Sequence, residues 1–176
     1  NLGIELFQTN RALRAHETFG SDKSITREEF YQYKFDTKYS TQSVMAVNLK
    51  KFLIEASSKD PDINEALKLL REWDLDTDST STATHLAIRA ISPQFNPADY
   101  DYDPEKIMHR LKKEVSWLKE NFGRLDVKWG DIQRLQRGET DLSLSGGPDI
   151  LRAVYSKEKD DRYVGIAGDC FYEIVE

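Results

Sequence analysis

The sequence contains a single cysteine, Cys170, among 176 residues. One cysteine excludes an internal disulfide and a zinc site built from several thiolates. No apolar run approaches the ~20 residues that a membrane-spanning helix needs, so we expect no membrane partner. Cations are also too few, since 25 Lys and Arg stand against 31 Asp and Glu. Because phosphate binding needs clustered Lys and Arg, we expect no nucleic acid partner.

Signatures of catalysis are equally scarce. The three histidines, His16, His85 and His109, are far apart, and none forms a two-histidine spacing on one helix face. Cys170 follows Asp169, whose negative charge disfavours a thiolate. The sequence contains no Gly-x-Ser-x-Gly elbow and no Gly-x-Gly-x-x-Gly loop. Residue chemistry alone therefore displays no catalytic centre and predicts neither a cofactor nor a metal.

What the sequence does contain is typical of a folded domain. Hydrophobic residues make up 39%, charged residues 32% and aromatic residues 11%, which argues against disorder. A chain of this length buries about 70% of the surface that its unfolded form exposes. It begins NLGIELFQTN, with neither an initiating methionine nor a basic signal region. We therefore expect a processed or excised piece of a longer protein.

Apolar residues at helical spacing predict that the first two-thirds of the chain, about residues 2–123, is helical. Capping residues suggest where individual helices begin and end. The predicted boundaries are Gly20 as the stop of a helix over 2–19, Thr26 with Glu29 as a capping box, Ser40 or Thr41 as an N-cap, Pro93 as a stop, and Asp103-Pro104 with Gly123 around the last helix.

The character of the sequence changes at about residue 127, because six of the nine glycines lie in the last third. Short apolar runs between them predict strands. These runs are Leu142–Leu144, Ile150–Tyr155, Tyr163–Ala167 and Cys170–Val175. The predicted fold class is α+β, with a helical part over 1–126 and a strand-and-turn part over 127–176. We expect the last strand to pair with chain that this segment lacks.

Two aspartate-rich loops invite a calcium interpretation. Asp74-x-Asp76-x-Asp78 has the alternating carboxylates that open an EF-hand loop, but Ser79 and His85 stand where that loop needs Gly and Glu. The loop from Asp99 to Asp103 fails at the same two positions. Helix capping is the favoured interpretation. A non-enzymatic helical interaction module, calcium-tuned through these loops, remains the alternative.

Several short motifs follow one another in an order that is more specific than any one of them. They are Asn10-Arg11-Ala-Leu-Arg14, Glu28-Glu29-Phe30, Asp36, Tyr39-Ser40, Leu70-Arg-Glu-Trp73-Asp74, Trp129-Gly130, Leu144-Ser-Gly146-Gly147 and Gly168-Asp169-Cys-Phe171. In this order they resemble the later part of the β-chain of the penicillin amidase family of acylases. That family belongs to the N-terminal-nucleophile hydrolases, so the chain resembles an inner segment of such a β-chain.

The resemblance implies hydrolysis of linear amide bonds in penicillins, cephalosporin side chains or acyl-homoserine lactones. It implies an N-terminal serine nucleophile and an oxyanion asparagine, both outside this segment, because position 1 is Asn. The isolated segment would then be inactive. Its partners would be the α-chain, the rest of the β-chain and a small amide substrate, in the periplasm or outside the cell, with no cofactor.

One active-site position of the family matches this segment. An arginine that supports the site electrostatically corresponds to Arg11, which is the one candidate catalytic residue here. The alternative is a helix-surface arginine that pairs with Glu17 or Asp22. The sequence leaves these two interpretations of Arg11 open.

Overall fold

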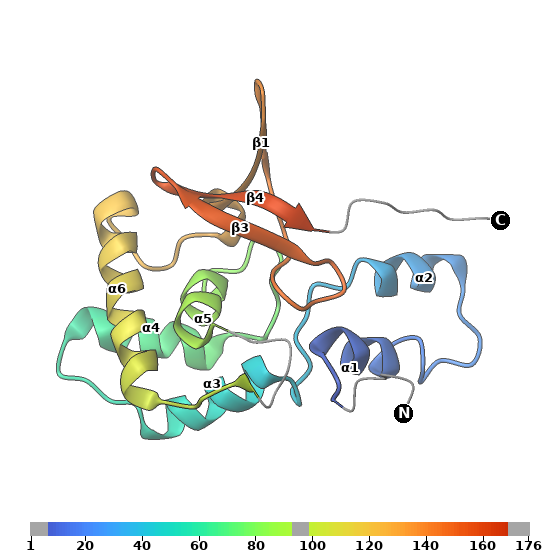
Figure 1. The fold of residues 1–176 in the computed structure, drawn as a ribbon, viewed down its shortest axis with the longest axis horizontal. Coiled ribbons are helices and arrows are strands. Elements are labelled where there is room, and N and C mark those ends of the chain that lie inside the picture. Colours follow the sequence, from blue (N-terminus) through green and yellow to red (C-terminus); the bar gives the residue numbers. More distant parts are fainter. Residues whose placement is uncertain (1–6, 93–98, 169–176) are drawn as a thin grey trace.

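A computed structural model describes residues 7–92 and 99–168. The described residues form seven helices and four strands (Figure 1): α1 (Asn10–Glu17), α2 (Arg27–Lys34), α3 (Val44–Glu55), α4 (Pro61–Glu72), α5 (Thr84–Ile91), α6 (Pro104–Phe122), α7 (Trp129–Ile132), β1 (Gln133–Arg137), β2 (Thr140–Ser143), β3 (Val154–Lys159) and β4 (Arg162–Gly168). The predicted α+β class is confirmed. The division into parts 1–126 and 127–176 stays a prediction.

Capping residues fix helix ends where the sequence predicts them. The Thr26 hydroxyl accepts from the Glu29 amide, and the Glu29 carboxylate accepts from the Thr26 amide, so the capping box is formed. At α6, Asp103 accepts from two first-turn amides and Pro104 is the first helical residue. Gly123 ends this helix in the left-handed region, at φ 71°.

Two predicted boundaries near the amino end are wrong. The first helix does not run over 2–19, of which 2–6 lie outside the described residues. It begins at Asn10, because Thr9 is extended and its hydroxyl accepts from the Ala12 amide. The cap of α3 is Ser43, whose hydroxyl accepts from the Ala46 amide, rather than Ser40 or Thr41. Ser40 bonds to groups of α1 instead.

The last third also departs from the prediction. The helix α7 and the strand β1 were not predicted, since their sequence has no clear apolar alternation. The strand expected to start at Ile150 starts at Val154, because Asp149 adopts a left-handed φ of 58° and the chain turns there. The predicted strand over 163–167 is confirmed by β4. The strand expected over 170–175 lies outside the described residues.

The four strands form one mixed sheet in the order β2-β1-β4-β3. The two inner strands, β1 and β4, are parallel, with Arg134 opposite Val164. The outer strands pair antiparallel with them. In Figure 1 the sheet lies over α5 and beside α6. Tyr163 of β4 contacts Trp117 of α6 at a ring-centroid separation of 5.4 Å, which joins the sheet to the helices.

One hydrophobic cluster is shared by the helices α3 to α7 and the sheet. Its fully buried side chains include Phe52, Leu67, Leu86, Leu111, Ile132 and Ile150. Burial of such apolar surface supplies the main driving force for folding. The first two helices contribute nothing to this cluster: none of the eight residues of α2 is buried, and Asn10 is the one buried residue among the eight of α1. The helix α1 contacts distant parts of the chain through polar groups.

Candidate functional site

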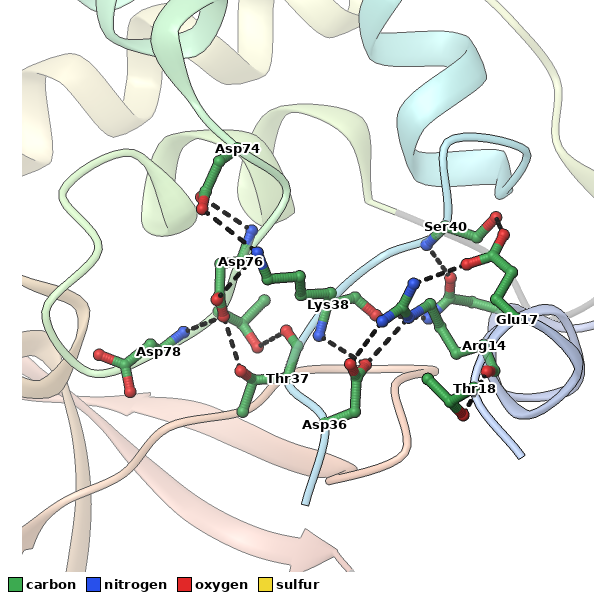
Figure 2. A network of polar contacts seen from close by, with 12 residues as sticks. Arg14, Glu17, Thr18, Asp36, Thr37, Lys38, Ser40, Asp74, Asp76 and Asp78 are labelled. Carbon is green, nitrogen blue, oxygen red and sulfur yellow. Dashed lines mark hydrogen bonds and ion pairs between the residues drawn. The ribbon is translucent and has the colours of Figure 1, made fainter. Parts of the chain in front are cut away.

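The centre of the polar contacts is a paired arginine and aspartate. Arg14 of α1 donates from Nε to Oδ1 of Asp36 at 3.0 Å and from Nη2 to Oδ2 at 2.5 Å (Figure 2). Both side chains are largely shielded, with 17% and 12% exposed. The hydrogen bonding of its guanidinium to the Asp36 carboxylate raises the pKa of Arg14. This two-point contact fixes both distance and orientation, which a single charge contact does not.

Residues 36–40, which we call the linking segment, run beside α1. The Asp36 carboxylate accepts from the backbone amide of Lys38 at 3.0 Å. Ser40 donates from its amide to Oδ1 of Asn10 at 2.7 Å and from its hydroxyl to Oε1 of Glu17 at 2.6 Å. The side-chain amide of Asn10 also donates from Nδ2 to the Lys38 carbonyl. Both ends of α1 are thus attached to the linking segment.

The other side of the linking segment contacts the first aspartate loop (Figure 2). The Thr37 hydroxyl donates to Oδ1 of Asp76 at 2.6 Å, and the Thr77 amide donates to the Thr37 carbonyl at 3.0 Å. Nζ of Lys38 lies 3.6 Å from Asp74 and 3.7 Å from Asp76. Segments separated by more than 30 positions in the sequence therefore meet along the linking segment.

The aspartates of that loop accept hydrogen bonds from the chain that follows each of them. Asp74 accepts from the Asp76 amide, Asp76 from the Asp78 amide, and Asp78 from the Thr80 amide and hydroxyl. The Thr80 amide lowers the pKa of Asp78. Together with Trp73 and Ser81 they line a polar cavity of about 270 Å³. Their contacts are those of turn-forming aspartates.

The second aspartate loop is used in the same way. Asp103 caps α6, and Nζ of Lys106 lies 3.4 Å from Asp101 and 3.3 Å from Asp103. Within 7–92 and 99–168, no group of three or more His, Cys, Asp or Glu side chains is arranged to hold a metal ion. The structure therefore provides no observation that favours the calcium-tuned alternative.

The predicted site residue, Arg11, lies at the amino end of α1. Its Nε lies 3.7 Å from Oδ1 of Asp149, and 41% of its side chain is exposed. The partners expected from the surface interpretation have other contacts, since Glu17 pairs with Arg14 and Asp22 accepts from the Tyr33 hydroxyl. Arg11 is thus held against a distant loop, and its role in a reaction stays a prediction.

Sequence reasoning missed Asp149. Its Oδ2 accepts from the Asn10 amide at 2.8 Å, and its backbone carbonyl accepts from Asn10 Nδ2 at 2.8 Å. Burial raises the pKa of this carboxyl group, while the Asn10 amide and the charge of Arg11 oppose that shift. The two glycines before Asp149 indicated a turn, but no local pattern indicated contact with a helix 139 positions away.

A second buried polar pair joins α5 and α6. His85 Nε2 lies 3.0 Å from Oε2 of Glu114, and 2% and 3% of these residues are exposed. Burial lowers the pKa of His85, although the contact with Glu114 opposes this. Burial would raise the pKa of Glu114, but hydrogen bonding to His85 lowers it. A neutral imidazole that donates from Nε2 to an ionised carboxylate agrees with the lowered pKa of His85 and with the lowered pKa of Glu114.

Aromatic and cationic groups surround this pair. The His85 ring stacks on Trp117, with centroids 5.0 Å apart and planes at 22°. Nε of Arg89 lies 3.8 Å from Oε1 of Glu114, and its guanidinium lies over the Tyr163 ring. The sequence assigned His85 no role, and a single histidine in a helical pattern carries no signal for such a partner. The other two histidines are exposed.

These observations define an α+β protein in which a mixed sheet is backed by helices and a peripheral helix is attached by charged groups. The family model described as Penicillin amidase matches residues 2–176, and the chain belongs to this family. It is thereby a member of a family of amide-bond hydrolases. A search of curated proteins gave no match. Across the described part of the chain, no helix combines the length and apolar character needed to cross a membrane.

The buried histidine predicts a dependence of stability on pH. The pKa of an unfolded histidine is about 6.5, and that of His85 is lower in the folded protein. As the pH falls below about 6.5, the unfolded state takes up the proton first. The free energy of unfolding should therefore fall by up to about 1.4 kcal/mol per pH unit until the pH passes the folded-state pKa. Urea unfolding between pH 7.5 and 5 measures this slope.

His85→Gln should flatten the slope, whereas His109→Gln, at an exposed histidine of α6, should leave it unchanged. Groups that do not contact His85 contribute equally to all three proteins, so the difference between slopes reports on His85 together with its partner Glu114. Equal slopes in the wild type and His85→Gln would contradict the assignment of a neutral buried imidazole.

Proposed function

We propose that this chain is an inner segment of the β-chain of an acylase that hydrolyses linear amide bonds. The observation that carries the proposal is the match to the Penicillin amidase family over residues 2–176. The substrates would be penicillins, cephalosporin side chains or N-acyl-homoserine lactones. The parent enzyme would be an N-terminal-nucleophile hydrolase, located in the periplasm or outside the cell.

The reaction would use groups that lie outside this segment. The hydroxyl of an N-terminal serine attacks the amide carbonyl, and the α-amine of that serine accepts its proton. Backbone N–H groups and an asparagine side chain hold the negatively charged oxygen. The C–N bond of the substrate then breaks, and the leaving amine takes up the proton from the serine α-amine, which gives an acyl-enzyme. Water hydrolyses the acyl-enzyme and releases the acid. The α-chain and the rest of the β-chain would supply these groups and the acyl pocket.

The contribution of this segment would be electrostatic support from Arg11. Three features favour that role. The residue lies in the first turn of α1, its side chain is about two-fifths exposed, and it pairs with a carboxylate that is itself buried. A fixed positive charge near the reaction centre stabilises negative charge that develops during acyl transfer. The hydrogen bonds between α1 and the linking segment would keep this charge in place.

The activity itself is tested with the full-length enzyme after its processing. It should release product from a chromogenic penicillin analogue or from an N-acyl-homoserine lactone, and mutation of its N-terminal serine should abolish the release. The isolated 176-residue segment should give no product above background. Turnover that scales with the amount of purified segment would contradict a nucleophile outside it.

The role of Arg11 is tested by Arg11→Lys in the processed enzyme. Lysine keeps the positive charge but loses the planar fork that gives fixed hydrogen-bond geometry. We expect kcat to fall about tenfold or more, which corresponds to roughly 1.4 kcal/mol of transition-state stabilisation. The melting temperature should stay near that of the wild type. Arg71→Lys, at an exposed arginine of α4, is the matched control and should keep full activity. An unchanged rate in Arg11→Lys would make Arg11 a surface residue.

A further inference from the structure

The loop between β2 and β3 carries a carboxylate to the amino end of α1. Oδ2 of Asp149 in this loop accepts from the backbone amide of Asn10 at 2.8 Å. The backbone carbonyl of Asp149 accepts from Nδ2 of Asn10, also at 2.8 Å. A negative group at this end of a helix is favourable, because the first backbone N–H groups lack partners in the helix. Asp149 thus forms part of the cap of α1.

Capping alone does not require the negative charge of Asp149. Only 6% of the residue is exposed, and the burial of a carboxylate is unfavourable unless a partner compensates for it. An asparagine at this position could accept from the Asn10 amide through its side-chain oxygen without that penalty. The charge therefore needs a different explanation.

The surroundings of Oδ1, the second carboxylate oxygen of Asp149, explain the charge. Oδ1 is buried and makes no hydrogen bond of regular geometry within the described residues, and it lies 3.7 Å from Nε of Arg11. Arg11 is the residue after Asn10, so one carboxylate faces both the helix amide and the guanidinium. The unsatisfied oxygen has the guanidinium as its charged neighbour.

Hydrogen bonds hold the turn that carries Asp149, so its carboxylate has a defined position. The residue has a left-handed φ of 58°, a turn conformation that aspartate tolerates better than most residues. The Tyr39 hydroxyl donates to the Pro148 carbonyl at 2.6 Å, and the Arg152 amide donates to the Asp36 carbonyl at 3.2 Å. Both ends of the turn are therefore tied to the linking segment.

We infer that Asp149 is a positioning residue for Arg11: its buried carboxylate fixes the direction of the Arg11 guanidinium from a loop 138 positions further along the chain. The inference rests on the proposed function, because it gives Asp149 a part in amide hydrolysis through Arg11. Asp149 itself does not touch the substrate. The competing explanation is that Asp149 only caps the helix.

The two explanations separate in Asp149→Asn, which keeps an acceptor for the Asn10 amide and removes the charge. In the full-length processed enzyme, we expect kcat to fall about tenfold with KM nearly unchanged, because a displaced charge weakens transition-state stabilisation more than substrate binding. The melting temperature should stay equal or rise. Asp141→Asn, which removes the carboxylate partner of Arg134 on the sheet edge, is the matched control and should keep full activity.

A double-mutant cycle with Arg11→Lys tests whether the two residues act as one unit. If Asp149 acts through Arg11, the double variant should be no slower than Arg11→Lys alone. Multiplied effects, or an unchanged kcat in Asp149→Asn beside a slow Arg11→Lys, would overturn the inference while leaving the proposed function intact. A wild-type enzyme without amide hydrolysis would instead contradict the proposed function.

Crystal structures of the wild type and Asp149→Asn provide a readout that is independent of activity. The Arg11 guanidinium should occupy one position in the wild type and a displaced position, or several, in the variant. An identical guanidinium position in both structures would overturn the inference whatever the enzyme hydrolyses.

Discussion

The contact between Arg14 and Asp36 is the constraint on which the attachment of α1 depends. Most helices of this chain are held by burying an apolar face, but α1 buries only Asn10 among its eight residues. Directional polar contacts connect it to distant parts of the chain. The planar fork of Arg14 meets both oxygens of Asp36, and the same carboxylate accepts from the Lys38 amide, so one aspartate connects the helix to the chain beside it. Figure 2 shows how the surrounding contacts extend outward from this pair.

The linking segment joins parts of the chain that are far apart in sequence. On one side it holds α1 and, through it, Arg11; on the other it contacts the aspartate loop that follows α4. The turn that carries Asp149 is bonded to the same segment. The hydrophobic cluster of the later helices and the sheet provides a stable base, and the polar contacts along the linking segment set the direction of charged groups. Substitutions in the hydrophobic cluster should therefore act mainly on stability, whereas substitutions in the polar contacts should act mainly on the position of α1 and its charged groups.

The sequence predicted what depends on neighbours along the chain. The capping box at Thr26 and the proline start of α6 are local hydrogen-bond patterns, so they could be read directly. Arg11 and Asp36 entered through the order of family motifs, not through their chemistry. The contact of Asp149 with α1 and that of His85 with Glu114 were not predictable, because each joins residues at least 29 positions apart by a fold that no local pattern specifies. The cap of α3 was misplaced for a related reason: the Ser40 hydroxyl that could have capped it bonds to Glu17 of a distant helix.

Hydrogen exchange of α1 tests most directly whether polar contacts alone hold this helix. Arg14→Met removes the fork but keeps a long apolar stem, and hydrogen bonds to charged groups contribute about 1.5–3 kcal/mol each. We predict that the amides of α1 exchange at least roughly tenfold faster in this variant, whereas those of α6 keep the wild-type rate. Lys68→Met, which removes an exposed ion pair of α4, should change neither. Unchanged exchange in α1 of Arg14→Met would contradict the account, as would equal acceleration in α1 and α6.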